Sequence, residues 1–171
     1  MKWIKCQVNV ENKHAFSTAQ EGWGELLHCA GFMGQIGGWN KNEPLEAGIL
    51  SVWKDLHSYQ RFMLFLKSDQ RSTYTKISVD IFEKIFNIGT TDITAFFGKG
   101  ILLRVTDCYV EKNKQAHFEQ MQKEVWNKGM MYSHGILSGT FGKSKTGDIW
   151  SPHYGTMNIH INGTWIRNCL P

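Results

Sequence analysis

The chain has 171 residues, of which 42% are hydrophobic and 20% are charged, and its formal net charge is +4 at pH 7. This composition provides enough apolar side chain for a packed core and excludes an intrinsically disordered chain. The small positive excess is spread along the sequence instead of forming a basic block, so we expect no nucleic-acid partner. No segment approaches the ~20 consecutive apolar residues of a membrane-spanning helix. We therefore expect no membrane association.

The N-terminal residues and the cysteines indicate the compartment. Two lysines stand within the first five residues, and Cys6-Gln7-Val8-Asn9 interrupts the apolar stretch that a secretion signal needs. The four cysteines are far apart and form no C-x-x-C pair, which disfavours a zinc ribbon or a redox motif. We expect a cytoplasmic protein with reduced thiols and no metal site.

Short strands and helices alternate in the first half of the chain. Apolar residues alternate with polar ones where strands are expected, and they recur every three or four residues where helices are expected. The predicted elements are strand 4–10, helix 16–30, strands 32–39 and 46–53, helix 58–66 and strand 74–82. This β-α-β-β-α-β order is that of a ferredoxin-like unit, which we expect over residues 1–86.

The pattern restarts after a polar, Gly- and Thr-containing linker over residues 87–100. Strand 101–110, helix 115–128 and strand 135–141 are predicted in the order of the first unit. The helix is expected to turn Phe118, Met121, Val125 and Trp126 inward. The residues themselves also repeat, since Val110-Glu111 corresponds to Val10-Glu11 and Trp126 corresponds to Trp23. An internal repeat of this length predicts a second, similar unit over residues 101–171.

This repeat is expected to be incomplete. No apolar periodicity is recognised after Asp148, where the first unit has a strand and a helix. A shifted reading of back-translated codons from Asp148 onward restores a Trp, a His-Ser pair and a Met in the register of Trp53, His57 and Met63. We hypothesise that residues 149–171 come from a frameshift, which sequencing the source gene across codons 140–171 tests.

Two motifs carry a resemblance to a known superfamily. Ala30-Gly31-Phe32-Met33-Gly34-Gln35 resembles the turn into the second strand of antibiotic-biosynthesis-monooxygenase-like and haem-degrading proteins. Ile49-Leu50-Ser51-Val52-Trp53-Lys54 and the aromatic helix after it resemble their third strand and second helix. The resemblance implies an α+β fold in which tandem ferredoxin-like units form a dimeric α+β barrel-type pseudo-dimer. The chain is then either a monomeric pseudo-dimer or a homodimer.

The same resemblance implies two kinds of chemistry. Haem-degrading members carry an Asn on the first strand, a Trp on the second helix and a His after it as the iron ligand. Here the helix position holds Phe62, and no His stands between His57 and His117. We therefore predict no cofactor and keep haem binding as the weakest alternative. Cofactor-independent quinone-forming monooxygenases need only a pocket, a polar group that orients a phenolic substrate, and a Trp or Asn near the reacting carbon.

Seven residues are candidates for a ligand pocket. Asn9, Gln35, Trp23 and Trp53 match the needs of a cofactor-independent oxygenase, although a periodic Trp more often fills the space between helix and sheet. His57, just before a helix, is either a general base or a helix-start residue. The full set is Asn9, Trp23, Gln35, Trp39, Trp53, His57 and Phe62.

The leading prediction is a small-molecule-binding protein that acts as a cofactor-independent monooxygenase on an aromatic or polyketide-like substrate. The alternative from another class is a non-catalytic ligand-binding or stress-associated module. The fold alone does not decide between them, so whether the chain is an enzyme stays open at this point, and the substrate is not identified.

Overall fold

The computed structural model describes residues 1–66, 75–99, 102–144 and 155–162, the last of these through the backbone alone. The chain divides into two units, Met1–Asp80 and Ile81–Arg167. Strand β4 (Thr75–Ile88) crosses this boundary along the chain and contributes to both units.

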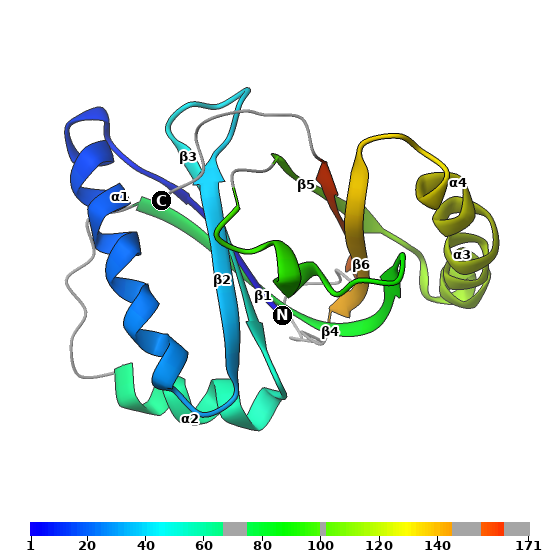
Figure 1. The fold of residues 1–171 in the computed structure, drawn as a ribbon, viewed down its shortest axis with the longest axis horizontal. Coiled ribbons are helices and arrows are strands. Elements are labelled where there is room, and N and C mark those ends of the chain that lie inside the picture. The colour runs from blue at the N-terminus through cyan, green and yellow to red at the C-terminus, as the bar shows by residue number, and fades with distance from the viewer. Residues whose placement is uncertain (67–74, 100–101, 145–154, 163–171) are drawn as a thin grey trace. The chain divides into compact units, whose positions relative to one another are not determined.

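The first unit packs helices against an antiparallel sheet. β3 pairs with both β1 and β2, and the strand order is β2-β3-β1-β4. Figure 1 shows α1 and η2 as one helical ribbon alongside β2, with α2 at its lower end. The elements, in which η1 and η2 are 3-10 helices, are β1 (Lys2–Gln7), η1 (Val10–Asn12), α1 (Lys13–Glu21), η2 (Gly22–His28), β2 (Phe32–Trp39), β3 (Glu46–Trp53) and α2 (Leu56–Leu66).

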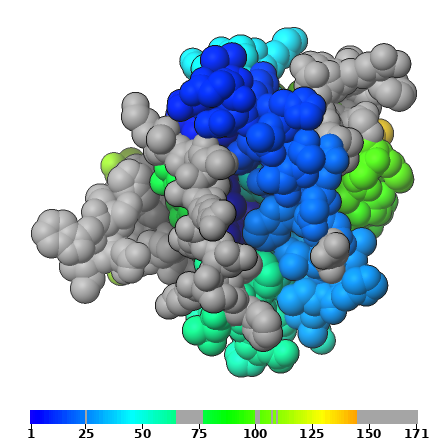
Figure 2. Space-filling view, turned by 90° about the vertical axis from the view of Figure 1, so that its left-hand side faces the viewer, coloured from blue at the N-terminus to red at the C-terminus, as the bar shows by residue number. Residues whose placement is uncertain are grey.

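A cluster of buried side chains shows which face of this sheet the helices cover. Phe16 of α1 is buried against alternate residues of β1 and β3, with Ile4 and Trp39 packed at the edge. The cluster consists of Cys6, Val8, Phe16, Ala47 and Ile49. Because alternate strand residues point to the same face, the helix-covered face also carries Lys2 of β1 and Ser51 and Trp53 of β3. In Figure 2, which faces the helical side, α1 and η2 form much of the visible surface in blue, with α2 in teal below.

Most elements of the first unit follow the sequence prediction, but the first helix does not. β2 and β3 have the predicted bounds, whereas the predicted helix 16–30 begins earlier, at Lys13, and ends as an α-helix at Glu21. Gly22 and Gly24 follow, and each glycine costs a helix interior about 1 kcal/mol relative to alanine. The chain continues as the 3-10 helix η2 through His28.

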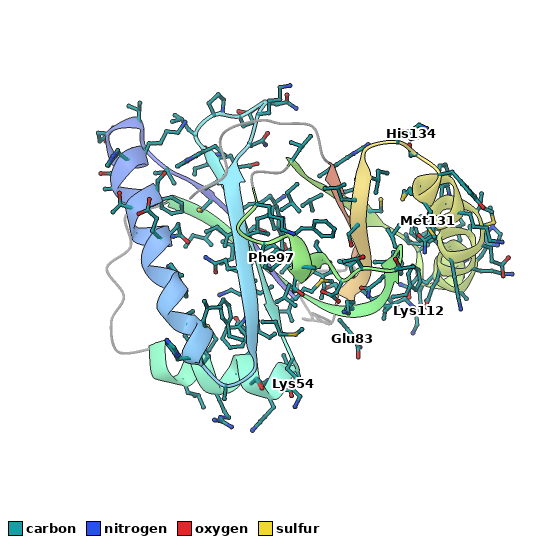
Figure 3. All side chains as sticks on the ribbon, viewed as in Figure 1. Lys54, Glu83, Phe97, Lys112, Met131 and His134 are labelled. Carbon is teal, nitrogen blue, oxygen red and sulfur yellow. The ribbon has the colours of Figure 1, made fainter. Side chains whose placement is uncertain are left out.

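The turn before β2 and the turn after β3 lie close together at one end of the sheet. Gly31 has a φ of +87°, and its carbonyl accepts a hydrogen bond of 2.8 Å from the Lys54 N–H. A Cβ atom at Gly31 would collide with the side chain of Ser58 in α2. Lys54 lies between the end of β3 and the start of α2 in Figure 3. The turn before β2 is therefore hydrogen-bonded to the turn that leads into α2.

The second unit pairs β7 with both β5 and β6, which gives the strand order β4-β6-β7-β5. Phe141 of β6 is fully buried, stacked on Phe86 with ring centroids 4.8 Å apart. Phe118 of α3 lies 6.4 Å from the Phe141 ring, so α3 covers this face of the sheet. The elements are η3 (Ile93–Phe96), β5 (Leu102–Tyr109), η4 (Lys112–Lys114), α3 (Gln115–Met121), the π-helix η5 (Gln122–Trp126), α4 (Asn127–Met131), β6 (Ile136–Ser144) and β7 (Gly155–Asn162).

The π-helix turn changes which residues of this helix are buried. The expectation that Val125 and Trp126 point inward is wrong, since their side chains are 50% and 57% exposed. Gln122 and Asn127 are buried instead, and their side chains form a 3.0 Å hydrogen bond. A π turn holds more residues than an α turn, so the inward face moves on by one position after Gln122.

Two segments differ from the sequence prediction in their secondary structure. β4 runs to Ile88, and η3 occupies part of the predicted linker 87–100. Strand β7 lies where no periodicity was recognised, although Met157, Ile159 and Ile161 alternate with polar residues there. Residues 145–154 and 163–171 lie outside the described residues, and the frameshift hypothesis concerns mainly these segments. It stays a prediction.

Candidate functional site

Three polar side chains lie in one row across the helix-covered face of the first unit. Ser51 of β3 is the register partner of Lys2 in β1 on one side and of Gln35 in β2 on the other. Directly opposed residues of neighbouring strands have Cβ atoms about 5 Å apart. Ser51 is buried, while Lys2 and Gln35 are partly buried. We call Lys2, Ser51 and Gln35 the polar row.

Five aromatic side chains pack alongside the polar row. Trp53 is at the centre, with ring centroids 4.9 Å from Phe62, 5.0 Å from Phe32 and 5.8 Å from Tyr59. Trp23 of η2 completes the group at 6.1 Å from Phe62. Trp23, Phe32, Trp53, Tyr59 and Phe62 form the aromatic cluster. It joins η2, β2, β3 and α2 into one apolar wall.

Hydrogen bonds connect the polar row to its surroundings. The indole Nε1–H of Trp53 donates to Ser51 Oγ at 3.2 Å, which leaves the serine hydroxyl proton available to another acceptor. Gln35 Nε2 donates to Gln20 Oε1 of α1 at 3.4 Å. The row thus offers hydroxyl and amide donors next to a flat aromatic surface.

Lys2 provides the positive charge of the polar row. Its Nζ lies 3.9 Å from Met63 Sδ and 5.3 Å from the centroid of the Tyr59 ring, both on α2. Burial lowers the pKa of the Lys2 ammonium, because removal of water disfavours the charged form. Burial raises the pKa of the Tyr59 hydroxyl for the same reason. Within the described residues, Lys2 forms no ion pair with a carboxylate.

The structure brings together four of the seven sequence-predicted candidates. Trp23, Trp53 and Phe62 belong to the aromatic cluster, and Gln35 belongs to the polar row. All four come from separate elements, so the packing of α2 and η2 on the sheet is what assembles them.

The other three candidates lie apart from this group. Trp39 packs on Phe16 at 5.6 Å and donates its indole N–H to Ser17 Oγ at 3.3 Å, within the cluster around α1. Asn9 is exposed before η1, and His57 is exposed in the first turn of α2.

Sequence reasoning missed Lys2, Ser51 and Tyr59. Tyr59 shares the helical spacing of Phe62, so the periodicity of α2 marks it as inward-facing. Lys2 and Ser51 carry no local signal, since a lysine or serine in a strand is ordinary. Strand pairing reveals them, because register brings residues 2 and 51 side by side.

No group of three or more His, Cys, Asp or Glu side chains in the described part of the chain is arranged to hold a metal ion. Among the helices of those residues, none combines the length and the apolar character that crossing a bilayer requires.

Comparison with known sequences identifies a family model and a relative. Residues 1–82 match the family model described as "Domain of unknown function (DUF4937)". The chain is also 37% identical over 92 residues to "Uncharacterized protein YdbC" of Bacillus subtilis (strain 168), a match that covers 49% of this chain and 77% of that protein.

Comparison with solved structures identifies the fold. An anthrone oxidase-like protein matches with a TM-score of 0.71 at 9% identity, over 95% of this chain and 73% of that chain. A "putative monooxygenase" from Lactobacillus acidophilus matches with a TM-score of 0.62 at 14% identity, over 94% and 75%. Another from Fusobacterium nucleatum subsp. nucleatum matches at 0.61 and 10% identity, over 94% and 74%. The chain shares their mixed α+β fold of antiparallel strands and helices.

Proposed function

The chain belongs to the family that includes YdbC and the domain DUF4937, and from this premise we propose that it is a small-molecule-binding, cofactor-independent monooxygenase. Its substrate is an aromatic or polyketide-like compound. The likeness in fold to proteins named monooxygenase and anthrone oxidase supports this reaction class by analogy.

One observation of the chain itself carries the proposal. The polar row lies directly against the aromatic cluster on the helix-covered face, linked through the Trp53–Ser51 hydrogen bond. A substrate with a flat ring system and oxygen substituents matches both parts. Aromatic side chains bind the ring by offset or edge contacts, and the donors of the row bind its oxygens.

The proposed reaction needs positioning more than it needs acid–base groups. Oxidation of an activated ring CH₂ to a carbonyl takes one oxygen atom of O₂ into the substrate. The other oxygen atom leaves as water with the two hydrogens. Trp53 and Phe62 would hold the ring, while Ser51 and Gln35 would orient its oxygen substituents. Orientation of this kind lowers the entropic part of the barrier.

The Trp53→Phe variant tests this proposal. Phenylalanine keeps an aromatic ring but removes the N–H that holds Ser51 Oγ. We expect oxygen uptake with anthrones and naphthols to fall by up to about tenfold, with ligand Kd changed less than threefold, because one neutral hydrogen bond is worth about 0.5–1.5 kcal/mol. An oxygen electrode and fluorescence titration measure the two quantities.

The matched control is Trp3→Phe. Trp3 is on the opposite face of β1, against Gly48, and should leave oxygen uptake and affinity unchanged. If wild-type protein binds members of the panel but consumes no oxygen with any of them, the enzyme proposal fails. The non-catalytic binding module then takes its place.

We also propose that the chain is a tandem of ferredoxin-like units forming a pseudo-dimer of the dimeric α+β barrel type. The supporting observation is a shared pairing order. In the first unit β3 pairs with β1 and β2, and in the second unit β7 pairs with β5 and β6. The echoed Val10-Glu11 and Val110-Glu111 follow corresponding strands.

A further inference from the structure

The ammonium group of Lys2 is directed into the first unit. A lysine at a sheet surface ordinarily extends its charged end into water while its methylene groups cover apolar surface. Lys2 instead places Nζ beside Met63 Sδ and over the ring of Tyr59, two side chains of α2. Its charge therefore lies on the helix-covered face, at one end of the polar row.

These contacts compensate the charge only in part. A thioether sulfur is a weak acceptor, and a cation–π contact is worth roughly 0.5–2 kcal/mol. The ion pairs among the described residues are Lys84–Asp92, Lys114–Glu111 and Lys143–Glu119, and none involves Lys2. A partly buried ammonium that has no carboxylate partner among the described residues gains most from a ligand that supplies a negative charge.

We propose that Lys2 binds an anionic oxygen of the ligand, so that the first unit selects planar aromatic molecules bearing a carboxylate or a phenolate. This inference rests on the proposed function, because it names the substrate class of the same site. Ser51 is the direct register partner of Lys2, so its hydroxyl is placed to donate to the same oxygen. The ring system then extends from the polar row along the aromatic cluster.

Pairs of probes that differ in charge but little in shape test the inference. 2-Naphthoate is compared with 2-naphthamide for the carboxylate, and 4-nitrophenolate with 4-nitroanisole for the phenolate. Isothermal titration gives Kd for each probe with the full chain. We expect the wild type to prefer at least one anion over its neutral counterpart by about tenfold or more, since a hydrogen bond to a charged group is worth about 1.5–3 kcal/mol. The pair that shows the preference identifies the anionic group.

Variants of two lysines on the same strand assign the preference. Lys2→Met should abolish it, and Lys2→Arg should retain most of it. Lys5→Met is the matched control, because Lys5 lies three residues further along β1, on the opposite face, with Gly48 as its register partner. Circular dichroism verifies folding. If Lys2→Met does not fold, the test rests on the preference for the anion over its neutral counterpart in the wild type and in Lys2→Arg.

Two outcomes would overturn the inference. One is a wild type that binds each anion and its neutral counterpart equally, or binds none of them. The other is a preference that persists in folded Lys2→Met. Neither outcome changes the oxygen uptake measured with neutral anthrones and naphthols. The proposed monooxygenase function is therefore tested independently of this inference.

Discussion

Trp53 and Trp39 both donate an indole N–H to a serine hydroxyl, yet they lie in different parts of the first unit. Trp53 contacts Ser51 in the polar row, whereas Trp39 contacts Ser17 of α1 and has the ammonium of Lys13 4.6 Å from its ring centroid. Both residues are tryptophans at the last position of a strand. Only the neighbours that strand register and helix packing supply distinguish a tryptophan of the candidate site from one that packs on α1.

At the residue scale we predict a pH-dependent contribution from Asp92. It caps η3, accepting from the backbone N–H of Thr94 at 3.0 Å and from Lys84 Nζ at 2.6 Å. Burial would raise the pKa of the Asp92 carboxyl, but the hydrogen bonds from Lys84 and Thr94 outweigh it and lower this pKa to about 2. A folded-state pKa below the usual 3.8 stabilises the folded state above pH 4, and this stabilisation is lost as pH falls toward 2.

Asp92→Ala should therefore lower the free energy of unfolding by about 1 kcal/mol at pH 7, the typical effect of losing a helix cap. The difference from wild type should shrink between pH 4 and pH 2. Urea denaturation at both ends of this range measures it. Asp80→Ala is the control, since the carboxylate of Asp80 accepts a 3.1 Å hydrogen bond from the hydroxyl of Ser78 at an exposed position. An equal loss at both pH values would contradict the assignment.

Part of the candidate site could be predicted from the sequence at this scale. Trp23 and Phe62 stand at inward positions of predicted helices, and Trp53 ends a strongly apolar strand, so periodicity alone placed them between helix and sheet. Lys2 could not be found in this way. Its proposed role depends on being opposite Ser51, and no local pattern encodes a pairing between residues 49 positions apart in a 171-residue chain.

At the scale of elements, the bounds of β2 and β3 were predicted more closely than those of the helices that precede β2 and β6. β2 and β3 are short apolar runs bounded by Gly31, Asn40 and the Asn-Glu-Pro turn, so their bounds follow from composition. The two long helices depart from a regular 3.6-residue period. Glycines end α1 early, and η5 inserts a π turn after α3, which a fixed period cannot anticipate.

Gly31→Ala is the element-scale prediction. The φ of +87° strains any residue with a Cβ, and here the Cβ also collides with Ser58. We expect a loss of about 2–4 kcal/mol in the free energy of unfolding, from strain and steric overlap together. Urea denaturation of the variant measures the loss.

Gly89→Ala separates the two causes. Gly89 has a φ of +90° with open space around it, so its substitution should cost the strain alone, about 1 kcal/mol. Adding Ser58→Gly to Gly31→Ala should recover the difference. If Gly31→Ala costs no more than Gly89→Ala, the close approach to α2 contributes nothing to stability.

At the scale of the whole molecule, the tandem proposal predicts the oligomeric state. Two ferredoxin-like units in one chain supply both halves of a barrel-type pair, so no second copy is required. Native mass spectrometry should show a monomer of 19.7 kDa over a range of protein concentrations. A dimer that persists on dilution would contradict the pseudo-dimer and favour pairing between chains.

The second unit shows why sequence reasoning is weakest near the end of this chain. Met157, Ile159 and Ile161 alternate with polar residues, but the run is short, and no apolar periodicity was recognised after Asp148. Pairing with both β5 and β6 makes it a central strand. Tertiary partners, not intrinsic propensity, determine the structure of so short a run.

The hydrogen bond between Gly31 and Lys54, with the close packing of Gly31 on α2, restricts how the aromatic cluster can move. Trp23 arrives from the segment just before Gly31, and Phe62 from the helix just after Lys54. Since these two segments are tied at their junction by the 2.8 Å hydrogen bond, the rings they carry move together and not apart. We therefore expect that a ligand bound beside these rings does not separate η2 from α2 at this junction. We expect the thickness of the entering molecule, more than its length, to decide what the first unit admits.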